Sequence, residues 1–399
     1  MKNKRSRRRI LIIVENLPCP FDRRVWQEAT TLQKNGYEVS IICPVGKGYD
    51  KRYEILEGVH IYRHPLPVEA KGAFGYLVEY SIALFWEFIL AWKVFFTRGF
   101  DVIHACNPPD NIFLIGLIFK LLGKKFVFDH HDINPELYEA KFGKRDLFYH
   151  IIRWWERLTF MTADISIATN ESYKKIAIER GRMNPEDVFV VRSGPTLDRL
   201  KILPPVETLK NGRKYLVGYV GVIGNQEGID YLLQAANYII NKKGRKDVHF
   251  GIVGSGPALS DMQALAKELG ISDYVTFTGR VPDKEMLEML NTADVCVNPD
   301  VGNEMNDKST MNKIMEYMAL GKPIVQFDLT EGKFSAQKAS LYAKWNSPED
   351  MAEKILHLLD NPDLRKEMGE YGKKRIENEL EWKYEAPKLL RAYEALFSR

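Results

Sequence analysis

The sequence is poor in cysteine and has no tract of low complexity. Its four cysteines are Cys19, Cys43, Cys106 and Cys296, and no two of them form a C-x-x-C pair. This spacing argues against a zinc site or a disulfide framework and indicates a reducing compartment, so we expect a cytoplasmic protein. A chain of 399 residues is too long for one ordinary core, and we expect two domains.

The sequence also lacks a strong excess of either charge. Its formal net charge is +4, which is too small to indicate a nucleic-acid partner. Basic residues gather in the segment 2–9, which is typical of a solvated flank and, alternatively, of a tail that lies on an anionic membrane surface. The apolar run that follows, 10–14, is too short for a secretory signal.

No long apolar stretch is free of charge. The segment 73–96 is long enough to span a bilayer, but two glutamates and a lysine interrupt it. Glu79, Ala83, Glu87 and Leu90 fall on one side of a helix, so the segment is amphipathic with a wide apolar face. We expect burial within a domain. The alternative is peripheral contact with a membrane surface, at the inner face of the cell membrane, and a span is least expected.

Short apolar runs alternate with helical periods through the first half of the chain. The expected strands are 10–14, 38–43, 59–62, 102–105, 126–129, 165–168 and 188–191, and the expected helices are 21–35, 74–96, 112–122, 147–160 and 172–180. Repeated strand–helix units of this kind form a parallel sheet covered on both faces. We therefore expect an α/β domain over residues 1–195.

A polar run punctuated by proline and glycine, 196–213, predicts a linker. A second strand–helix series follows in 214–380, with expected strands at 216–220, 249–253, 275–278, 295–297 and 324–327. The fold class is thus α/β, with two Rossmann-like domains whose parallel sheets face each other across a cleft. Ligands of such sheets bind beyond the carboxyl ends of the strands.

The segment 306–325 predicts a polar loop, a helix over 311–319 and a short strand. Met311, Ile314, Met315 and Met318 recur at helical spacing, so we expect one face of this helix to pack inward. Ser309 or Thr310 is expected to cap the helix. Its first turns carry Asn312, Lys313 and Glu316, where the positive end of the helix dipole attracts phosphate. A lysine beside a carboxylate can hold a phosphate and a sugar diol together. The alternative is a surface helix with ordinary charges.

Two glycine-rich loops follow strands of the second domain. One carries Gly221 and Gly224, and the other carries Gly254 and Gly256. Glycines at strand ends let backbone N–H groups approach a pyrophosphate, so we interpret both loops as part of a nucleotide site. The alternative interpretation of either loop is a tight turn.

The first domain places polar residues at the ends of its strands. His131 and Asp132 close one strand, where they can hydrogen-bond sugar hydroxyls and Asp132 can orient the imidazole; the alternative is a pair of satisfied polar groups. Asn107 and Asp110 close the preceding strand. No D-x-D pair occurs, so we expect no metal ion and no other cofactor, and Lys, Arg and helix ends would neutralise phosphates.

These motifs resemble glycosyltransferases of family 4, which have the two-Rossmann GT-B architecture. The resemblance covers essentially the whole chain: FDRRVWQEATTLQKNGYEV from residue 21, the His-Asp pair at 131, the turn at Gly221, GSGP from 254 and NKIMEYMALGKPIV from 312. The last motif is the most specific. The chain is similar to the branch of the family that builds bacterial or archaeal surface polysaccharides.

The resemblance implies a nucleoside-diphosphate sugar held mainly by the second domain, and a glycan or lipid-linked acceptor held by the first. It also implies transfer with retention at the anomeric carbon and a final helix, 381–399, that packs back on the first domain. Glu316 matches the glutamate that holds the ribose hydroxyls, and His131 matches the histidine near the transferred sugar. The expected acceptor-side residues are Asn16, Asp22, Arg23, Asn107 and Asp110.

The chain departs from the family pattern where the phosphates bind. A first motif glutamate is replaced by Lys308, and the usual phosphate-binding arginine and lysine fall at Val222 and Glu227. We hypothesise that Lys308 and Lys313 supply the missing charge, with Arg192 or Arg280 in addition. The expected catalytic residues are then His131, Asp132, Lys308 and Glu316.

Alternatives to a retaining transferase remain open. Asp132 as acceptor base would imply inversion. A GT-B nucleotide-sugar epimerase would need no acceptor, and a non-catalytic nucleotide-sugar-binding pseudoenzyme would show no turnover.

Overall fold

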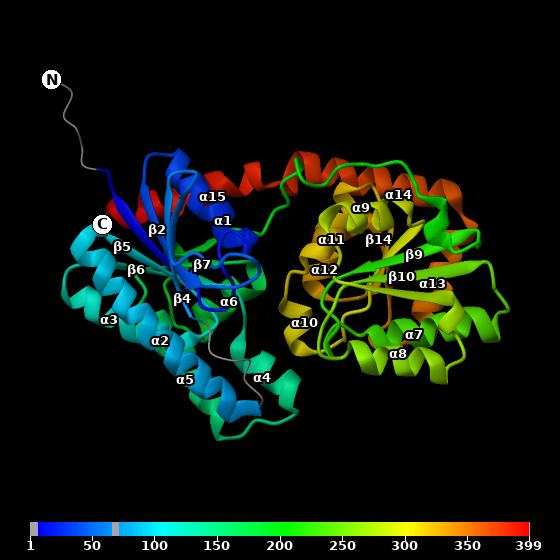
Figure 1. Ribbon diagram of the computed structural model, residues 1–399, viewed down its shortest axis with the longest axis horizontal. Helices are drawn as coiled ribbons and strands as arrows, with labels where there is room; N and C mark the ends of the chain where they lie inside the picture. The colour runs from blue at the N-terminus through cyan, green and yellow to red at the C-terminus, as the bar shows by residue number, and fades with distance from the viewer. Residues whose placement is uncertain (1–6, 66–71, 399) are drawn as a thin grey trace. The chain divides into compact units, whose positions relative to one another are not determined.

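The computed structural model describes residues 7–65 and 72–398. The chain divides into an N-terminal unit, Met1–Ser193 with Glu385–Arg399, and a C-terminal unit, Gly194–Tyr384 (Figure 1). Each unit contains one sheet of mostly or entirely parallel strands with helices packed on it. The predicted fold class, two Rossmann-like α/β domains, is confirmed.

The N-terminal sheet has the strand order β3-β4-β2-β1-β5-β6-β7-β8. Its strands are β1 (Arg9–Ile13), β2 (Glu38–Pro44), β3 (Tyr53–Leu56), β4 (Val59–His64), β5 (Val102–Cys106), β6 (Lys125–His130), β7 (Ile165–Ala168) and β8 (Val188–Val190). All neighbours pair in parallel except β3, which runs antiparallel to β4 at the edge. The sequence did not predict β3, which is a short edge strand with half-exposed side chains.

Helices of the N-terminal unit connect these strands. They are α1 (Arg23–Lys34), α2 (Gly72–Thr97), α3 (Phe113–Leu121), α4 (Asn134–Phe142), α5 (Leu147–Thr162) and α6 (Glu171–Glu179), and they are joined by the end of α15 (Trp382–Ser398). Tyr393 of α15 is fully buried, and its hydroxyl lies 2.7 Å from Nδ1 of His104 on β5. The short helix α4 was not predicted.

The long apolar helix α2 is buried along one side only. Ala83, Glu87, Ala91 and Val94 are fully buried, whereas Phe85 is 59% exposed. Within the described residues, the part Val78–Thr97 is long and apolar enough to cross a membrane by length and composition alone. The expected burial of this helix is therefore confirmed for the face that carries Glu87 and not for the face that carries Phe85.

The C-terminal sheet has the strand order β11-β10-β9-β12-β13-β14, with every pairing parallel. Its strands are β9 (Tyr215–Val220), β10 (Val248–Val253), β11 (Val275–Gly279), β12 (Val295–Asn298), β13 (Ile324–Phe327) and β14 (Ser340–Ala343). The edge strand β14 was not predicted. The other five lie where the apolar runs place them.

Helices cover both faces of this sheet. They are α7 (Ile229–Asn237), α8 (Leu259–Glu268), α9 (Asp283–Thr292), α10 (Glu304–Lys308), α11 (Asn312–Ala319), α12 (Thr330–Ala336), α13 (Pro348–Asp360) and α14 (Pro362–Arg375). One apolar cluster joins the sheet to α7 and α13, and another joins it to α9 and α11.

Helix α11 has the predicted apolar face but not the predicted cap. Ile314, Met315 and Met318 are at most 1% exposed, as their helical spacing predicts, whereas Met311, also expected on this face, is only partly buried. The N-cap residue is Met311, which makes no side-chain capping bond. Ser309 instead donates its hydroxyl to the carbonyl of Met305 in α10, so the expected cap by Ser309 or Thr310 is wrong. The N-cap residue of α11 therefore contributes no side-chain cap to the first turn.

Candidate functional site

The two glycine loops of the C-terminal unit pack directly on each other at the carboxyl ends of β9 and β10. A Cβ atom on Gly254 would lie 1.8 Å from the carbonyl oxygen of Gly221, and one on Gly256 would lie 2.4 Å from that of Ile223. The φ angle of Gly254 is +145°, which also favours glycine. No other residue fits at these positions, so the glycines have a structural role that requires no ligand.

A tyrosine joins these loops to helix α11. The Tyr219 hydroxyl donates to the carbonyl of Val222 at 2.8 Å, and Nζ of Lys313 lies 3.5 Å from the same hydroxyl and 4.9 Å from the ring centroid. The predicted Lys313 and the predicted loop at Gly221 are thus brought together at the carboxyl edge of the sheet. This edge is where parallel α/β sheets bind ligands.

Lys313 is already paired with a protein carboxylate. Its Nζ lies 2.9 and 3.1 Å from the two oxygens of Asp300, which is 2% exposed. Burial raises the pKa of Asp300, although Lys313 opposes that change. Burial also raises the pKa of Glu227, which interacts electrostatically with both residues. Oε2 of Glu227 has no hydrogen-bond partner among the described residues, and a Cβ on Gly224 would lie 2.7 Å from it.

Glu316, the residue expected to hold a ribose, forms an ion pair with Arg199. Arg199 also lies 3.3 Å from Asp283. The side chain of Glu316 is 15% exposed, so it is only partly accessible. Arg199 belongs to the predicted linker 196–213 and was missed, because nothing in its local sequence distinguishes it from any solvated arginine.

The remaining predicted donor-side residues lie at the surface. Asn312 and Arg280 are exposed. Nζ of Lys308 forms an ion pair at 2.5 Å with Glu304, one turn earlier on α10. The structure thus brings together the glycine loops and Lys313, whereas Lys308 has a carboxylate partner on its own helix.

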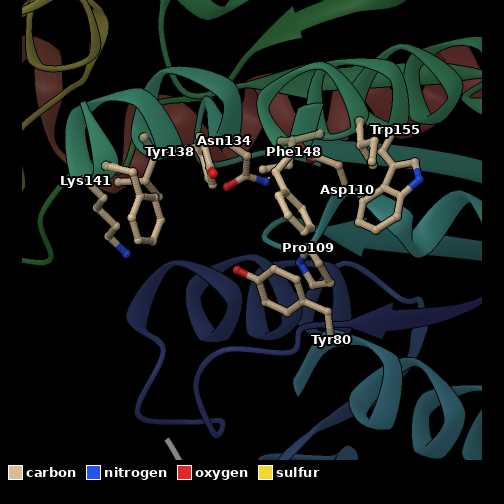
Figure 2. A pocket seen from close by; sticks show the side chains of 12 residues that line it. Tyr80, Pro109, Asp110, Asn134, Tyr138, Lys141, Phe148 and Trp155 are labelled. Carbon is tan, nitrogen blue, oxygen red and sulfur yellow. The ribbon is translucent and has the colours of Figure 1, made fainter. Parts of the chain in front are cut away.

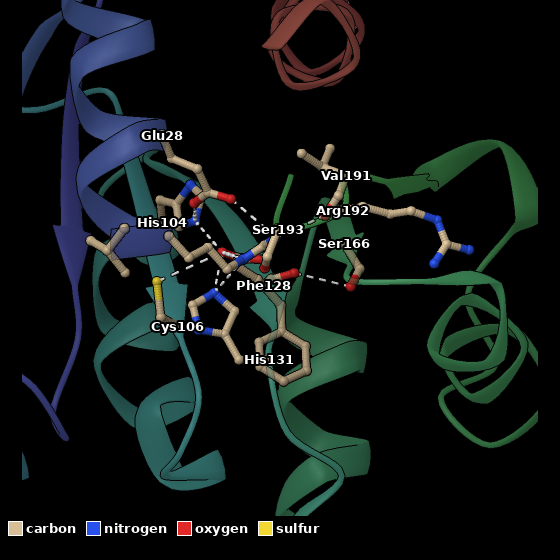
Figure 3. Close-up of polar contacts among 12 residues, drawn as sticks. Glu28, His104, Cys106, Phe128, His131, Ser166, Val191, Arg192 and Ser193 are labelled. Carbon is tan, nitrogen blue, oxygen red and sulfur yellow. Dashed lines mark hydrogen bonds and ion pairs between the residues drawn. The ribbon is translucent and has the colours of Figure 1, made fainter. Parts of the chain in front are cut away.

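The N-terminal unit contains a buried polar cluster around Asp129, at the end of β6 (Figure 3). The Arg24 guanidinium lies 2.8 Å from one oxygen of Asp129 and 3.0 Å from Glu28. The other Asp129 oxygen contacts Nε2 of His131 and lies 3.2 Å from Nε2 of His104. Burial would raise the pKa of Asp129, but Arg24 and His131 hold it well below its ordinary value, whereas burial raises the pKa of Glu28.

His131 is therefore oriented by Asp129 rather than by Asp132. This corrects the expectation that Asp132 fixes the imidazole. Asp132 follows the end of β6, its main-chain carbonyl accepts a hydrogen bond from Asn107 at 2.6 Å, and burial raises the pKa of its side chain. Similarly, Arg24 enters the cluster, whereas the predicted Arg23 lies exposed on the other side of α1.

Asn107 holds the backbone that carries His131. Its Oδ1 accepts from the N–H groups of His131 at 2.6 Å and Asp132 at 3.2 Å, and its Nδ2 donates to Asp110 at 2.8 Å. Asn134 donates to the other oxygen of Asp110 at 2.8 Å. The structure thus brings together four predicted residues, with Asn107 and Asp110 in positioning roles.

The two other predicted acceptor-side residues have different environments. Asp22 caps α1 by accepting from the N–H of Val25 at 3.1 Å, and Asn16 is exposed in the loop after β1.

The donors of the buried cluster also lie close enough to be candidate metal ligands. Two such groups exist among the described residues, His104 with Cys106 and Asp129, and Glu28 with Asp129 and His131. The Arg24 guanidinium lies within 3.0 Å of Asp129 and Glu28 and supplies positive charge at this position. A metal ion would have to displace it, so these residues do not fit one well. The absence of a metal cofactor stays a prediction.

Comparison with solved structures identifies the class of protein that this fold defines. Sucrose-phosphate synthase from Thermosynechococcus elongatus has a TM-score of 0.79 at 18% identity, covering 98% of this chain and all of that chain. Anabaena HepE, solved with UDP and glucose, has a TM-score of 0.73 at 14% identity over 98% and 99% of the two chains. Both share the GT-B architecture, so the protein has the fold of GT-B glycosyltransferases.

Sequence comparison gives the family. The model described as Glycosyltransferase Family 4 matches residues 22–199, and the model described as Glycosyl transferases group 1 matches residues 214–361. An uncharacterized glycosyltransferase of Methanocaldococcus jannaschii is 24% identical over 379 residues, 92% of this chain and 91% of the relative. The chain belongs to glycosyltransferase family 4 and is a glycosyltransferase.

A partial match supports the same class. Alpha-D-kanosaminyltransferase of Streptomyces kanamyceticus is 30% identical over 158 residues, which cover 39% of each chain.

Proposed function

We propose that the enzyme transfers a sugar from a nucleoside-diphosphate sugar to a glycan or lipid-linked acceptor in surface polysaccharide synthesis, with retention. The observation that carries the proposal is the contact of Lys313 with Tyr219, which brings the start of α11 beside the glycine loops. Anabaena HepE, of the same fold, was solved with UDP-glucose, and WaaG, of the same fold, is involved in lipopolysaccharide biosynthesis.

The donor would bind at the carboxyl edge of the C-terminal sheet. Its diphosphate would lie at the glycine loops and the first turn of α11, where backbone N–H groups and the helix dipole favour negative charge. Lys313 would supply a cation, in competition with Asp300 and Glu227, and Lys308 and Arg280 would supply further positive charge. Glu316 would accept hydrogen bonds from the ribose hydroxyls, in place of or beside Arg199.

The acceptor would bind at the carboxyl edge of the N-terminal sheet, at His131. Because Nε2 of His131 is turned to Asp129, Nδ1 is the ring nitrogen available to a sugar hydroxyl. In a retaining front-face reaction the leaving phosphate takes the proton of the attacking hydroxyl, and fixed cations stabilise the charge that develops on that phosphate. If Asp132 acted as the base, the product would be inverted.

The first experiment is a thermal-shift screen against nucleoside-diphosphate sugars, followed by assay of the hit with candidate acceptors. A ligand at about 100 times its Kd stabilises the native state by roughly 2.7 kcal/mol, which is a readily measured rise in Tm. NMR of the anomeric proton then distinguishes retention from inversion. Isomerisation of the donor alone would favour an epimerase, and donor binding without any turnover would favour a pseudoenzyme.

The role of Lys308 has a matched control. Lys308→Ala should weaken donor binding by about tenfold, the value of one charge-assisted hydrogen bond. Lys354 on α13 forms a similar surface pair with Asp350, with side chains 29% and 27% exposed, and Lys354→Ala should leave donor binding unchanged. Equal affinities in the two variants would remove Lys308 from the site.

We also propose that the enzyme is cytoplasmic and touches the membrane surface through α2 and α3. These helices pack through Trp92 and Phe119, whose ring centroids are 4.9 Å apart. Their outer faces expose a set of large apolar side chains, here called the apolar face: Val78, Ile82, Phe85, Ile89, Phe96, Leu114, Leu117, Ile118, Leu121 and Leu122. Exposed apolar side chains gathered on neighbouring helices are typical of an interaction site.

A further inference from the structure

The N-terminal unit contains a pocket whose walls are almost entirely apolar (Figure 2). Its volume is about 310 Å³, which lies in the range of small-molecule sites. Helices α2, α4 and α5 and the turn after β5 form it, and Figure 2 shows Tyr80 of α2 and Phe148 of α5 on opposite sides. The remaining apolar lining residues are Pro109, Leu137, Tyr138, Phe142, Ile151, Ile152 and Trp155.

The polar atoms at the floor of this pocket already have protein partners. The carboxylate of Asp110 accepts from Asn107 and Asn134, at 2.8 Å each. The Tyr138 hydroxyl donates to Asp146 at 3.0 Å. Burial raises the pKa of Asp110 to about 7, as expected for a carboxyl in low-dielectric surroundings. A sugar in this pocket would leave its hydroxyls unpaired, which is costly, whereas a hydrocarbon would not.

The pocket lies next to the acceptor-side residues. Nδ2 of Asn107 donates to the carboxylate of Asp110, which lines the pocket, at 2.8 Å. The same group donates to the main-chain carbonyl of Asp132 at 2.6 Å. Lys141, on the α4 side of the pocket, acts on Asp132 through space and opposes the rise in the Asp132 pKa that burial causes. The apolar walls and Lys141 therefore lie close to the residues around His131.

We propose that this pocket binds the hydrocarbon chain of a lipid-linked acceptor, with the phosphate of the lipid near Lys141 and the acceptor sugar toward His131. This inference rests on the proposed function, because it names the chemical class of the acceptor. A hydrocarbon gains free energy from leaving water for an apolar pocket in proportion to the area buried. A glycan without a lipid has no hydrocarbon chain that could pack against these apolar side chains.

The test is calorimetric titration of the full-length protein with farnesyl phosphate. Binding should show a negative heat-capacity change, the signature of buried apolar surface. Ile152→Trp and, separately, Ile151→Trp should fill the pocket and weaken binding by at least about tenfold, because each methylene left in water costs several-fold in affinity. Trp154→Ala is the matched control, since Trp154 lies on the outer side of α5 and is 59% exposed.

The outcomes separate this inference from the proposed function. No binding of farnesyl phosphate, or equal binding by wild type and both filled-pocket variants, would overturn the inference. Full competition by inorganic phosphate would also overturn it, because the site would then be an anion site only. Vesicles of phosphatidylglycerol should bind wild type and Ile152→Trp alike, and loss of vesicle binding in the variant would assign the pocket to a bilayer lipid instead.

Donor binding serves as the independent readout. The thermal shift with UDP-glucose, or with the donor found in the screen, should be the same in wild type, Ile152→Trp and Trp154→Ala, because the pocket lies in the N-terminal unit and the glycine loops in the C-terminal unit. A protein that binds farnesyl phosphate but no nucleotide sugar would contradict the proposed function and leave the pocket assignment intact.

Discussion

Lys313 on α11 and Asp300 after β12 form a buried ion pair, with Nζ 2.9 Å from Oδ1. The lysine predicted to balance a donor phosphate is thus balanced by the protein itself. A buried pair contributes little net stability, but loss of one partner leaves an uncompensated charge. If the donor binds as proposed, its diphosphate would have to share Lys313 with Asp300, and the carboxylates around the lysine would weaken its binding.

Removal of the Lys313 side chain should lower both donor affinity and stability, and a second substitution should restore only the stability. Lys313→Met should weaken binding of the donor found in the screen by at least about tenfold. It should also lower the free energy of unfolding by ~3 kcal/mol, because Asp300 is left buried and unpaired. The double variant Lys313→Met/Asp300→Asn should recover most of the stability but not the affinity. Calorimetry and urea denaturation measure the two quantities. Wild-type affinity in the double variant would show that Lys313 does not contact the donor.

Glu227 should oppose donor binding in a pH-dependent way. Burial raises the pKa of Glu227, so the group is protonated to a higher pH than a free glutamate. As the pH rises through that pKa, the carboxylate acquires a negative charge near Lys313, and diphosphate affinity should fall. Glu227→Gln should bind the donor found in the screen more tightly above that pKa, by about three- to tenfold for one removed like charge at moderate screening.

The ratio of the donor affinities of wild type and Glu227→Gln at each pH reports the ionisation of Glu227 alone. The phosphates of the nucleotide change their charge with pH equally in both experiments. Calorimetry from pH 5 to 8 measures this ratio. If the two proteins keep a constant affinity ratio across this range, Glu227 does not titrate beside the donor.

The periodic apolar residues were enough to predict most of the fold. Ile314, Met315 and Met318 predicted the buried face of α11. All twelve expected strands lie within a residue or two of an observed strand, because most of them are buried on both faces. The missed elements, β3, β14, α4 and α10, are edge strands or short helices. Their stability comes from neighbours far away in the sequence, and local periodicity does not carry that information.

The candidate site could be predicted only in part, for a similar reason. Motif spacing identified His131, Lys313 and Glu316, but not the side chains that bind them. Asp129, Asp300 and Arg199 come from other elements, and only the folded sheet edge brings them within hydrogen-bonding distance. The sequence contained one signal for the buried cluster around Asp129. Arg24 and Glu28 are oppositely charged and four residues apart on an otherwise buried helix face, and such a pair predicts a buried partner.

Arg24 should be essential for the stability of the N-terminal unit. Arg24→Met leaves Asp129 and Glu28 buried without their cation and should lower the free energy of unfolding by ~3–5 kcal/mol. Arg23→Met, at the adjacent exposed position, should change it by no more than about 0.5 kcal/mol. Urea denaturation of the two variants provides the comparison. Similar losses in both would mean that the charge of Arg24 is not what holds the cluster together.

Glu15, just after β1, should make the protein less stable as the pH rises. Burial and the charge of Glu79 raise the pKa of Glu15 from 4.5 to about 8. Between these values the unfolded chain has lost the proton that the folded state keeps, so the folded state binds more protons and stability falls with increasing pH. At about 1.4 kcal/mol per pH unit, the loss reaches at most ~5 kcal/mol by pH 8.

Glu15→Gln should remove this pH dependence and be more stable than wild type at pH 8. Denaturation at pH 5 and pH 8 measures the effect, with Glu57→Gln at an exposed position as the control. An unchanged slope in Glu15→Gln would mean that another buried carboxyl group, such as Glu87, dominates the titration.

The apolar face of α2 and α3 should carry membrane binding. Phe85 and Leu121 are 59% and 88% exposed, and burial of either in a lipid interface would contribute roughly 1.5–3 kcal/mol. Phe85→Asp/Leu121→Asp should therefore reduce binding to phosphatidylglycerol vesicles by at least about tenfold, as measured by co-sedimentation. Ile202→Asp is the control, because Ile202 is 59% exposed in the C-terminal unit. If the control variant lost as much binding as the double variant, the contact would not be specific to α2 and α3.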